Sequence, residues 1–217
     1  MALAAITLTI MATIAVGCTS KLDTSGAFGG HDYVDLGLPS GTLWATRNVG
    51  ADKPQEFGDY FSWGETQPKE IYNWDNYKHC KVDGGRTLIK YYATDNLTEL
   101  QPEDDAAVAN WGTNWCIPSY DQWKELEENT DATWTKFNGA RGYLVTGPNG
   151  NSLFLPAARC RWQEDYEGFG DYGIYWSTSL YTGYNWDAWT FTFDSDEFNV
   201  KHDYRGDGRS VRAVVRR

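Results

Sequence analysis

The chain has 217 residues and a formal net charge of −11, and its 41% hydrophobic and 23% charged residues exclude disorder driven by excess charge. A pI near 4.7 argues against a nucleic-acid partner, because phosphate contacts need a basic surface. Aromatic residues make up 16% of the chain, with 11 Trp, 14 Tyr and 9 Phe. This excess is unusual for a core built on Leu, Ile and Val.

The N-terminal segment predicts export. Residues 1–17 carry no charge and are shorter than the roughly 20 apolar residues of a membrane-spanning helix. The run from Ala15 to Cys18 (Ala-Val-Gly-Cys) resembles a bacterial lipobox, in which the cysteine thiol is acylated, although Ala15 stands where Leu is usual. We expect residues 1–17 to be a lipoprotein signal peptide and Cys18 to be the lipidation site. A buried N-terminal helix is the alternative.

The next segment predicts a tether. Residues 19–30 (TSKLDTSGAFGG) are small and polar and include three Gly, a composition typical of flexible linkers. We therefore expect residues 18–30 to tether a folded domain to a lipidated Cys18. No further linker, charge block or internal repeat interrupts the chain, so the sequence predicts one domain over residues 31–217.

In the first half of this domain the sequence predicts one strand and two helices. Residues 42–49 alternate with the period of two that a half-buried strand requires. A helix is expected around Pro102–Asn110, opened by acidic residues that suit a helix N-terminus. The clearest helix runs from Ser119 to Asn129, where Ser119 and Gln122 form a capping box ahead of an apolar stripe.

The second half predicts strands. Tyr143–Thr146 and Ser152–Leu155 flank the turn formers Gly147 to Gly150 and indicate a hairpin. Ala188–Phe193 places three aromatic residues on one face, which we expect in the core, and Ser210–Val215 is a last short strand. The aromatic residues expected to be buried in the scaffold are Trp44, Trp63, Trp111, Trp123, Trp176, Trp189, Phe191 and Phe193.

The cysteines and histidines show no metal-binding pattern. Three cysteines follow Cys18 without forming a CxxC unit: Cys80, Cys116 and Cys160. An exported protein could pair two of them, and the sequence leaves this open. The histidines have no HExxH or other ligand spacing: they are His31, His79 and His202. We expect no metal and no cofactor.

Few helices, many short strands and long aromatic-rich loops indicate an α+β domain. Several blocks of the chain, in order, resemble the Fibrobacter succinogenes major paralogous domain family, which is common in lipoproteins of gut Bacteroidetes. These blocks are HDYVDLGLPSGTLWATRNVGA (31–51), GDYFSWGET (58–66), PEDDAAVANWGTNWCIP (102–118), GYLVTGPNGNSLFLPAA (142–158), GIYWSTS (173–179) and GRSVRAV (208–214).

The resemblance covers residues 31–215 and implies a C-type-lectin-like fold of the formylglycine-generating-enzyme type. Such a fold has short strands, two main helices and long loops; its first and last strands pair, and a loop-rich face displays ligand contacts. The chain departs from the family pattern at Cys116, at Arg159-Cys160-Arg161 and at Ala213. The fold's catalytic branch uses a redox-active cysteine pair, and Cys160 is the only cysteine in the second half of the expected domain, residues 124–217.

Many members of this family are similar to variable proteins of diversity-generating retroelements, whose C-terminal segment is rewritten on a fixed scaffold. The segment from Tyr175 onward has a matching texture, with scaffold-like residues alternating with Tyr, Asn, Asp, His and Arg. The resemblance implies that this segment forms the binding face. The expected ligand-binding residues are Tyr181, Tyr184, Asn185, Trp186, Asp187, Asp194, Asp196, Asn199, Lys201, His202, Asp203, Tyr204 and Arg205.

Catalytic and calcium sites are weaker interpretations. Glu164-Asp165, or Asp194 with Asp196, could flank a sugar as in a glycosidase, but 30 acidic residues make such pairs expected by chance. Ser177 lacks a GxSxG turn. Trp74-Asp75-Asn76 and Asn185-Trp186-Asp187 resemble parts of the calcium-lectin motif, but the Glu-Pro-Asn or Gln-Pro-Asp triplet is missing from the appropriate loop. We expect no catalytic residues.

Binding fits the composition better than catalysis. Tyr and Trp provide large rigid contact area, and Asn, Asp and Ser add adaptable hydrogen bonds, the mixture that antibody loops use. We therefore expect a monomeric, non-enzymatic lipoprotein, anchored in the outer membrane, that binds a protein or glycan on a host or bacterial surface. Family analogy favours a protein or cell-surface ligand. The alternatives are a carbohydrate-binding, lectin-like module and, with less support, a glycan-active hydrolase.

Overall fold

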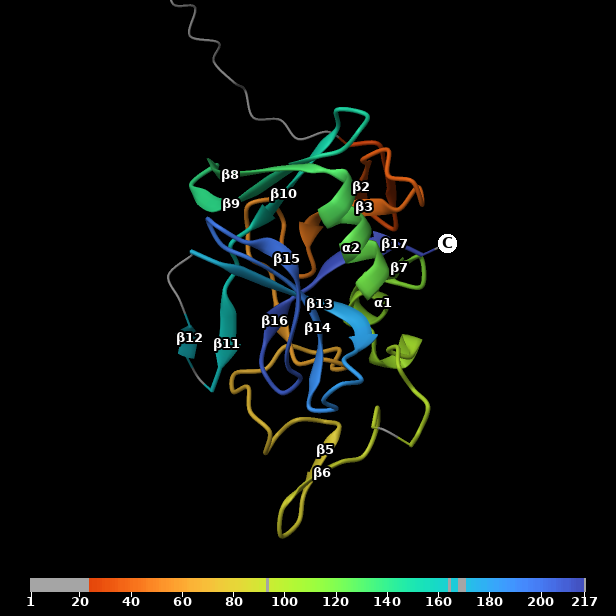
Figure 1. The fold of residues 1–217 in the computed structure, drawn as a ribbon, viewed down its shortest axis with the longest axis vertical. Helices are drawn as coiled ribbons and strands as arrows, with labels where there is room; N and C mark the ends of the chain where they lie inside the picture. The colour runs from red at the N-terminus through yellow and green to blue at the C-terminus, as the bar shows by residue number, and fades with distance from the viewer. Residues whose placement is uncertain (1–23, 93, 164, 168–170, 217) are drawn as a thin grey trace, which may run out of the picture.

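The computed structural model describes residues 24–92, 94–163, 165–167 and 171–216. Within them the chain is mostly β-sheet, with two α-helices and long loops, so the fold is α+β with short strands, as the sequence predicts (Figure 1). The expected signal peptide over residues 1–17 and the expected lipidation site at Cys18 lie outside the described residues, as does Glu164.

One five-stranded sheet joins both ends of the domain, in the order β1-β2-β3-β17-β7. Its strands are β1 (Gly26–Phe28), β2 (His31–Asp35), β3 (Leu43–Asn48), β7 (Trp115–Cys116) and β17 (Arg212–Val215). The last strand, β17, is antiparallel to both β3 and β7. The strand predicted at 42–49 is present, but it is not half-buried: Trp44 packs into one core cluster and Ala45 into the other, so both faces of β3 are covered.

The expected tether over residues 18–30 is wrong for its C-terminal part. There β1 pairs with β2, with Gly26 opposite Tyr33 and Phe28 opposite His31. The Phe28 ring also stacks on the Tyr33 ring, with centroids 5.4 Å apart. The edge of a sheet accepts another segment through backbone groups alone, so a short run of small residues can form a strand there.

A second five-stranded sheet has the order β15-β14-β13-β16-β4. Its strands are β4 (Tyr60–Phe61), β13 (Gly173–Leu180), β14 (Asp187–Phe193), β15 (Phe198–Tyr204) and β16 (Arg209–Ser210). The strand expected over Ser210–Val215 is therefore split, with Ser210 in this sheet and Arg212 in the first. The buried Arg212 side chain stabilises the point where the chain passes from the second sheet to the first. Its guanidinium donates to Asn48 Oδ1 at 2.9 Å and to the Phe154 carbonyl at 2.9 Å.

Three smaller sheets complete the strands of the described residues. The predicted hairpin is confirmed: β9 pairs with β10 with Thr146 opposite Ser152, and β8 extends the pair to a three-stranded sheet. The bounds of these strands are β5 (Cys80–Val82), β6 (Arg86–Leu88), β8 (Asp131–Phe137), β9 (Ala140–Thr146), β10 (Ser152–Pro156), β11 (Cys160–Trp162) and β12 (Asp165–Glu167). β5 pairs with β6, and β11 pairs with β12.

Helix α2 (Tyr120–Asn129) begins as predicted, with Ser119 at the N-cap and both hydrogen bonds of the capping box present. The other expected helix, Pro102–Asn110, is instead a 3-10 turn, η1 (Pro102–Asp104), followed by α1 (Ala106–Trp111). The two are separate because Asp105 is extended and caps α1, its carboxylate accepting from the Ala107 N–H at 2.8 Å. Within the described residues, neither helix has the length and apolarity of a membrane span.

The core consists of two aromatic-rich clusters. One contains Trp44, Trp123 and Phe191, with the Trp123 and Phe191 rings stacked at 4.6 Å; the other contains Trp63 and Trp176. Six of the eight aromatic residues expected to be buried are fully so: Trp44, Trp63, Trp123, Trp176, Phe191 and Phe193. The other two, Trp111 and Trp189, are only partly buried.

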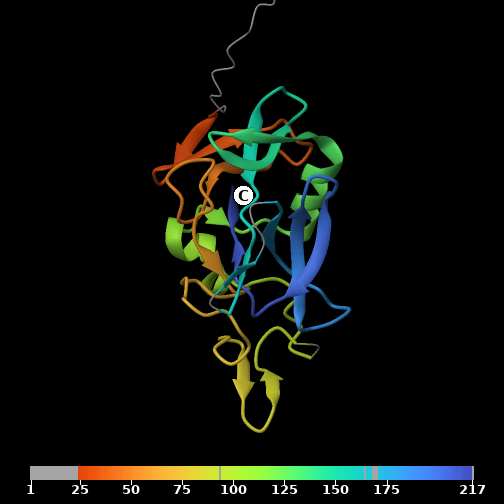
Figure 2. The same ribbon diagram turned by 90° about the vertical axis from the view of Figure 1, so that its left-hand side faces the viewer.

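Residues 62–92, which we call the long loop, carry the β5–β6 hairpin, and Trp63 and Tyr91 near the two ends of the loop pack in the second core cluster. Figures 1 and 2 show this hairpin projecting at one end of the molecule, with β8–β10 at the opposite end. The connection from β13 to β14, residues 181–186, reaches the same end as the hairpin (Figure 1). The fold therefore brings the long loop and the C-terminal segment together.

Candidate functional site

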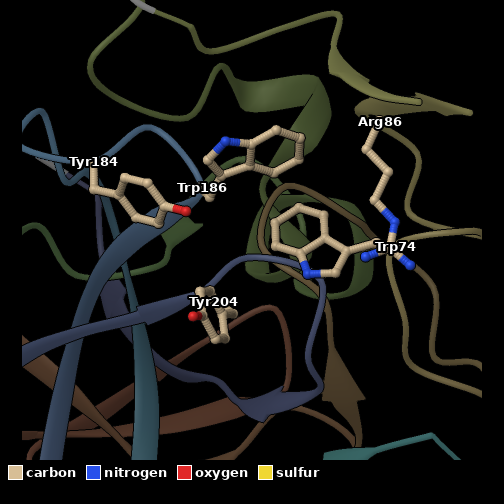
Figure 3. A pocket seen from close by; sticks show the side chains of 5 residues that line it. All are labelled: Trp74, Arg86, Tyr184, Trp186 and Tyr204. Carbon is tan, nitrogen blue, oxygen red and sulfur yellow. The ribbon is translucent and has the colours of Figure 1, made fainter.

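A pocket of about 270 Å³ lies between the long loop and the C-terminal segment. Its lining residues are Trp74, Arg86, Tyr184, Trp186 and Tyr204. Figure 3 shows the four aromatic rings around one central space, with Arg86 beside Trp74. We call this site the aromatic pocket.

Three rings of the aromatic pocket, those of Trp74, Trp186 and Tyr204, are held by contacts with one another. Trp74 meets Trp186 edge to face, with centroids 4.9 Å apart, and meets Tyr204 in the same way at 6.3 Å. Gly206 lies behind Trp74, where a Cβ atom would come within 3.2 Å of the indole, so the absence of a side chain allows this close packing. Tyr184 and Tyr204 are each 51% exposed, which leaves ring surface open to a ligand.

A charged pair stands at the rim of the aromatic pocket. Arg86 donates through Nη2 to Asp75 Oδ1 at 3.0 Å, and both side chains are about half exposed or more. An exposed pair of this kind contributes little to stability, so both groups remain available for hydrogen bonds to a ligand.

Arg205 was expected to bind ligand, and the structure corrects this expectation. Its side chain is fully buried. The guanidinium lies 4.8 Å from the Trp63 ring centroid and 5.5 Å from that of Tyr77, and its Nε donates to the Tyr77 hydroxyl at 3.0 Å. Among the described residues no carboxylate forms an ion pair with it, so aromatic faces and neutral oxygens surround this cation.

Arg205 fixes both walls of the aromatic pocket. On one side its guanidinium donates to the carbonyls of Lys90 at 3.0 Å and Tyr91 at 2.8 Å, in the long loop. On the other side it donates to the Asn185 carbonyl at 2.8 Å, and its backbone N–H donates to the Trp186 carbonyl at 3.0 Å. Arg205 is therefore a positioning residue behind the pocket.

Tyr91 links Arg205 to a second buried charge. Its φ of 59° is in the left-handed region, which for a bulky residue costs roughly 1–3 kcal/mol unless the surroundings hold it. Its carbonyl accepts from Arg205, and its hydroxyl donates to Asp104 Oδ2 at 2.7 Å. The two buried charges together hold this residue in its strained conformation.

Asp104 is the second anchor of the long loop. It is 2% exposed and receives hydrogen bonds from Lys78 Nζ at 2.5 Å, Lys90 Nζ at 2.6 Å and the Tyr91 hydroxyl. Burial acts to raise the pKa of Asp104, but these hydrogen bonds outweigh burial and lower the pKa to about 2. The carboxylate therefore stabilises the loop only while it is ionised.

Asp187 and His202 form a pair beside the aromatic pocket. Asp187, also expected to bind ligand, is buried, and its Oδ2 lies 2.7 Å from His202 Nδ1. Burial raises the pKa of Asp187, while the hydrogen bond from His202 opposes this rise. The His202 ring is exposed and stacks on Tyr181 at 3.8 Å. Asp187 thus orients His202 and does not itself reach a ligand.

Four expected ligand-binding residues lie between the middle of the β14–β15 hairpin and its far end, away from Tyr204. Phe193 opposite Phe198 marks that end, and Asp187 opposite Tyr204 marks the end at the pocket. Asp194 accepts hydrogen bonds from the backbone of the intervening turn, as an Asx turn does. The residues that the structure does not bring to the pocket are Asp194, Asp196, Asn199 and Lys201.

Asp203 lines a neighbouring cavity of about 480 Å³ together with Trp162 and Tyr204. Its Oδ2 accepts from Arg209 Nη2 at 2.8 Å. Tyr204 borders both this cavity and the aromatic pocket, so it occupies the centre of the candidate surface. Of the expected residues, the structure brings three together in the aromatic pocket: Tyr184, Trp186 and Tyr204.

Sequence reasoning missed Trp74 and Arg86. In sequence, Trp74-Asp75-Asn76 resembles only a fragment of a calcium motif. Within the described residues no group of three or more His, Cys, Asp or Glu side chains could hold a metal ion. The sequence offers no specific signal for Arg86, and it does not indicate which distant segment faces Trp74.

Other chemical candidates lie outside the pocket. Ser177 is 1% exposed and its hydroxyl donates to the Trp189 carbonyl at 2.9 Å, so it is part of the interior. No disulfide joins the three cysteines of the described residues, which are Cys80, Cys116 and Cys160. Burial raises the pKa of the Cys116 thiol to about 12, so this thiol is not a nucleophile at neutral pH.

Replacing Arg205 tests its role as an anchor. We expect Arg205→Met to lower the free energy of unfolding by about 3 kcal/mol or more, because several buried carbonyl oxygens lose their donor at roughly 1–3 kcal/mol each. The matched control is Arg86→Met, which removes an exposed guanidinium and should change stability by less than about 0.5 kcal/mol. Urea denaturation measures both. Equal stabilities of the two variants would contradict a buried structural role for Arg205.

The pKa of Asp104 predicts acid sensitivity. Because its pKa is lowered in the folded protein, Asp104 adds stability that is present above about pH 4 and is lost as pH falls toward pH 2, amounting to about 2 kcal/mol. We expect Asp104→Asn to lower stability at pH 7 and to show a smaller loss than wild type between pH 4.5 and 2. Denaturation curves at several pH values measure this, with the exposed neighbour Glu103→Gln as control. If the stability of Asp104→Asn fell with pH as steeply as that of the wild type, Asp104 would not be the source of the acid sensitivity.

Comparison with protein-family models, with curated proteins and with solved structures found no match. The geometry of the aromatic pocket and its surroundings therefore carries the functional argument.

Proposed function

We propose that this chain is a binding protein that uses its aromatic pocket and the surface around it to hold a protein or other cell-surface ligand, without catalysing a reaction. The observation that carries this proposal is the pocket itself. Four aromatic rings from two distant segments meet around one space, and a buried arginine fixes both segments. Rigid aromatic side chains of this kind give large contact area at low entropic cost.

The surroundings of the pocket favour a protein ligand. Seven large hydrophobic side chains are exposed in the described residues, and six of them lie on the long loop or on segments that line the two adjoining cavities. These six are Val82, Ile89, Tyr92, Trp162, Tyr184 and Tyr204. Exposed apolar side chains gathered at one end typically mark an interaction site. The aliphatic members, Val82 and Ile89, suit a protein surface better than a sugar.

We also propose the C-type-lectin-like fold and membership of the family that the sequence resembles. The arrangement supports this proposal in three respects. The C-terminal strand β17 shares a sheet with β1, β2 and β3, although it pairs with β3 and not, as expected, with the first strand; α2 packs on β13, β14 and β15; and one end of the domain is rich in loops. The same resemblance underlies our proposal of a lipid anchor at Cys18 and display on the outer membrane.

Retroelement diversification is part of the same proposal. Arg205 and Asp187 are buried, whereas Tyr184, His202 and Tyr204 are exposed, so we expect variation at the exposed positions. A near-repeat of the C-terminal coding segment beside a reverse transcriptase gene would support this origin. Codon variation concentrated at the buried positions would contradict it.

A carbohydrate ligand is the second candidate. The half-exposed rings of Tyr184 and Tyr204 stand near the Arg86–Asp75 pair, and flat aromatic faces next to hydrogen-bonding charged groups suit a sugar ring. This candidate explains the aromatic pocket but not the exposed aliphatic side chains of the long loop, Val82 and Ile89.

Substitution at the centre of the candidate surface tests the proposal. We expect surface extracts of host or bacterial cells to yield a ligand whose affinity falls at least about 10-fold with Tyr204→Ala, because a central aromatic anchor typically contributes about 1.4 kcal/mol or more. The control is Phe28→Ala, which removes an exposed aromatic side chain on β1, away from the aromatic pocket. This variant should leave the affinity unchanged.

Protein capture and a glycan array distinguish the two kinds of ligand. Captured proteins that depend on Tyr204 support protein binding, whereas glycan-array signals lost in Tyr204→Ala would favour the carbohydrate candidate. Equal losses with Tyr204→Ala and Phe28→Ala would place the binding surface elsewhere and contradict the proposal.

A further inference from the structure

The four rings of the aromatic pocket enclose a space with the chemistry of a cation site. Figure 3 shows Tyr184, Trp186, Trp74 and Tyr204 on successive sides of one central space. The faces of Trp and Tyr rings carry negative potential and attract an ammonium or guanidinium group placed within about 6 Å of their centroids. A cavity of about 270 Å³ has room for one basic side chain.

The protein already holds a cation in this way directly behind the pocket. The Arg205 guanidinium rests against the rings of Trp63, Tyr77 and Tyr91, at 4.8, 5.5 and 6.0 Å. Tyr77 in turn meets Trp74, a wall of the pocket, edge to face at 5.4 Å. Aromatic faces and carbonyl oxygens thus accommodate a positive charge here without a carboxylate partner among the described residues.

Two charged side chains on the rim of the pocket, Arg86 and Asp75, affect its affinity for a cation. Arg86 would repel an incoming cation, and Asp75 offsets this repulsion because its carboxylate lies 3.0 Å from Arg86 Nη2. The chain as a whole carries a net charge of −11, which favours the approach of basic partners. Removing Arg86 or Asp75 should therefore change cation affinity in opposite directions.

We propose that the aromatic pocket is a cation-recognition site that receives a lysine or arginine side chain presented by the protein ligand. This inference rests on the proposed function, since it specifies the chemical group by which that ligand is anchored. The rings of Trp74, Trp186 and Tyr204 contact the cation and its alkyl stem, and Tyr184 covers its open side. The Arg86–Asp75 pair sets the charge at the entrance.

The test uses defined probes and the purified full-length protein. One pair of probes is acetyl-Gly-Lys-Gly-amide and the same peptide with norleucine, which keeps the side-chain length and removes the charge. A second pair is choline and 3,3-dimethyl-1-butanol, its neutral isostere. Binding is followed by NMR shifts of the tryptophan indole N–H signals at about 20 mM salt, where charge effects are only weakly screened.

We expect the lysine peptide to bind at least about 5-fold more tightly than the norleucine peptide, in the range that cation–π contacts provide. Arg86→Gln should increase lysine-peptide affinity, by about 3-fold, and Asp75→Asn should decrease it. Lys81→Gln removes an exposed positive charge from the same hairpin outside the pocket and should have a smaller effect than Arg86→Gln. Tyr184→Ala should reduce the preference for lysine over norleucine, because it uncovers one side of the site and leaves three rings.

Equal affinities for lysine and norleucine peptides would overturn the cation site, as would unchanged affinities in both Arg86→Gln and Asp75→Asn. Selective binding of choline without binding of the lysine peptide would also overturn it, since the site would then serve a small quaternary ammonium ligand. Because the probes do not depend on the cellular partner, failure of cation selectivity leaves the Tyr204-dependent capture of a partner intact. Conversely, selective probe binding without a captured partner would count against the proposed function only.

Discussion

The structure of the candidate site depends on one buried guanidinium. Arg205 donates to carbonyls at the end of the long loop and to a carbonyl in the connection between β13 and β14, so a single side chain ties together segments that are far apart in sequence. A buried cation without a carboxylate partner among the described residues is costly unless its donors are satisfied. Here the backbone carbonyls and three aromatic rings meet this requirement, and they can do so only if both segments are in place.

Asp104 complements this arrangement from the other side of Tyr91. The strained backbone of Tyr91 joins a buried cation through its carbonyl and a buried anion through its hydroxyl. The long loop contains little regular structure, only the short β5–β6 hairpin, so local propensity contributes little to its conformation. The buried hydrogen bonds of Arg205 and Asp104, and not regular secondary structure, hold the loop in one conformation. A loop that is already ordered loses less entropy when it binds a ligand.

The sequence predicts features whose causes are local. The capping box of α2 and the Gly147–Gly150 turn depend on residues a few positions apart, and both are confirmed. The sequence also predicts that aromatic residues of the C-terminal segment form a surface, and Tyr184, Trp186 and Tyr204 do meet in a pocket. What it does not predict depends on distant contacts. Neighbouring Tyr204 and Arg205 both look like ligand-binding residues, yet one is 51% exposed and the other is fully buried, because successive side chains at the end of a strand face opposite directions.

The aromatic excess of the composition divides into a core and a site. Most Trp and Phe residues fill or pack against two clusters around the sheets, whereas the pocket rings stand on loops and at the end of β15, at one end of the molecule. The central claim is that Arg205 holds both walls of that pocket. Amide hydrogen exchange in Arg205→Lys tests it most directly, because lysine keeps the charge but loses the fork of donors. The account predicts faster exchange, by at least about 10-fold, at the amides of Ile89 and Asp187 together, with no change at Leu144 in β9. Unchanged protection at Ile89 and Asp187 would contradict it.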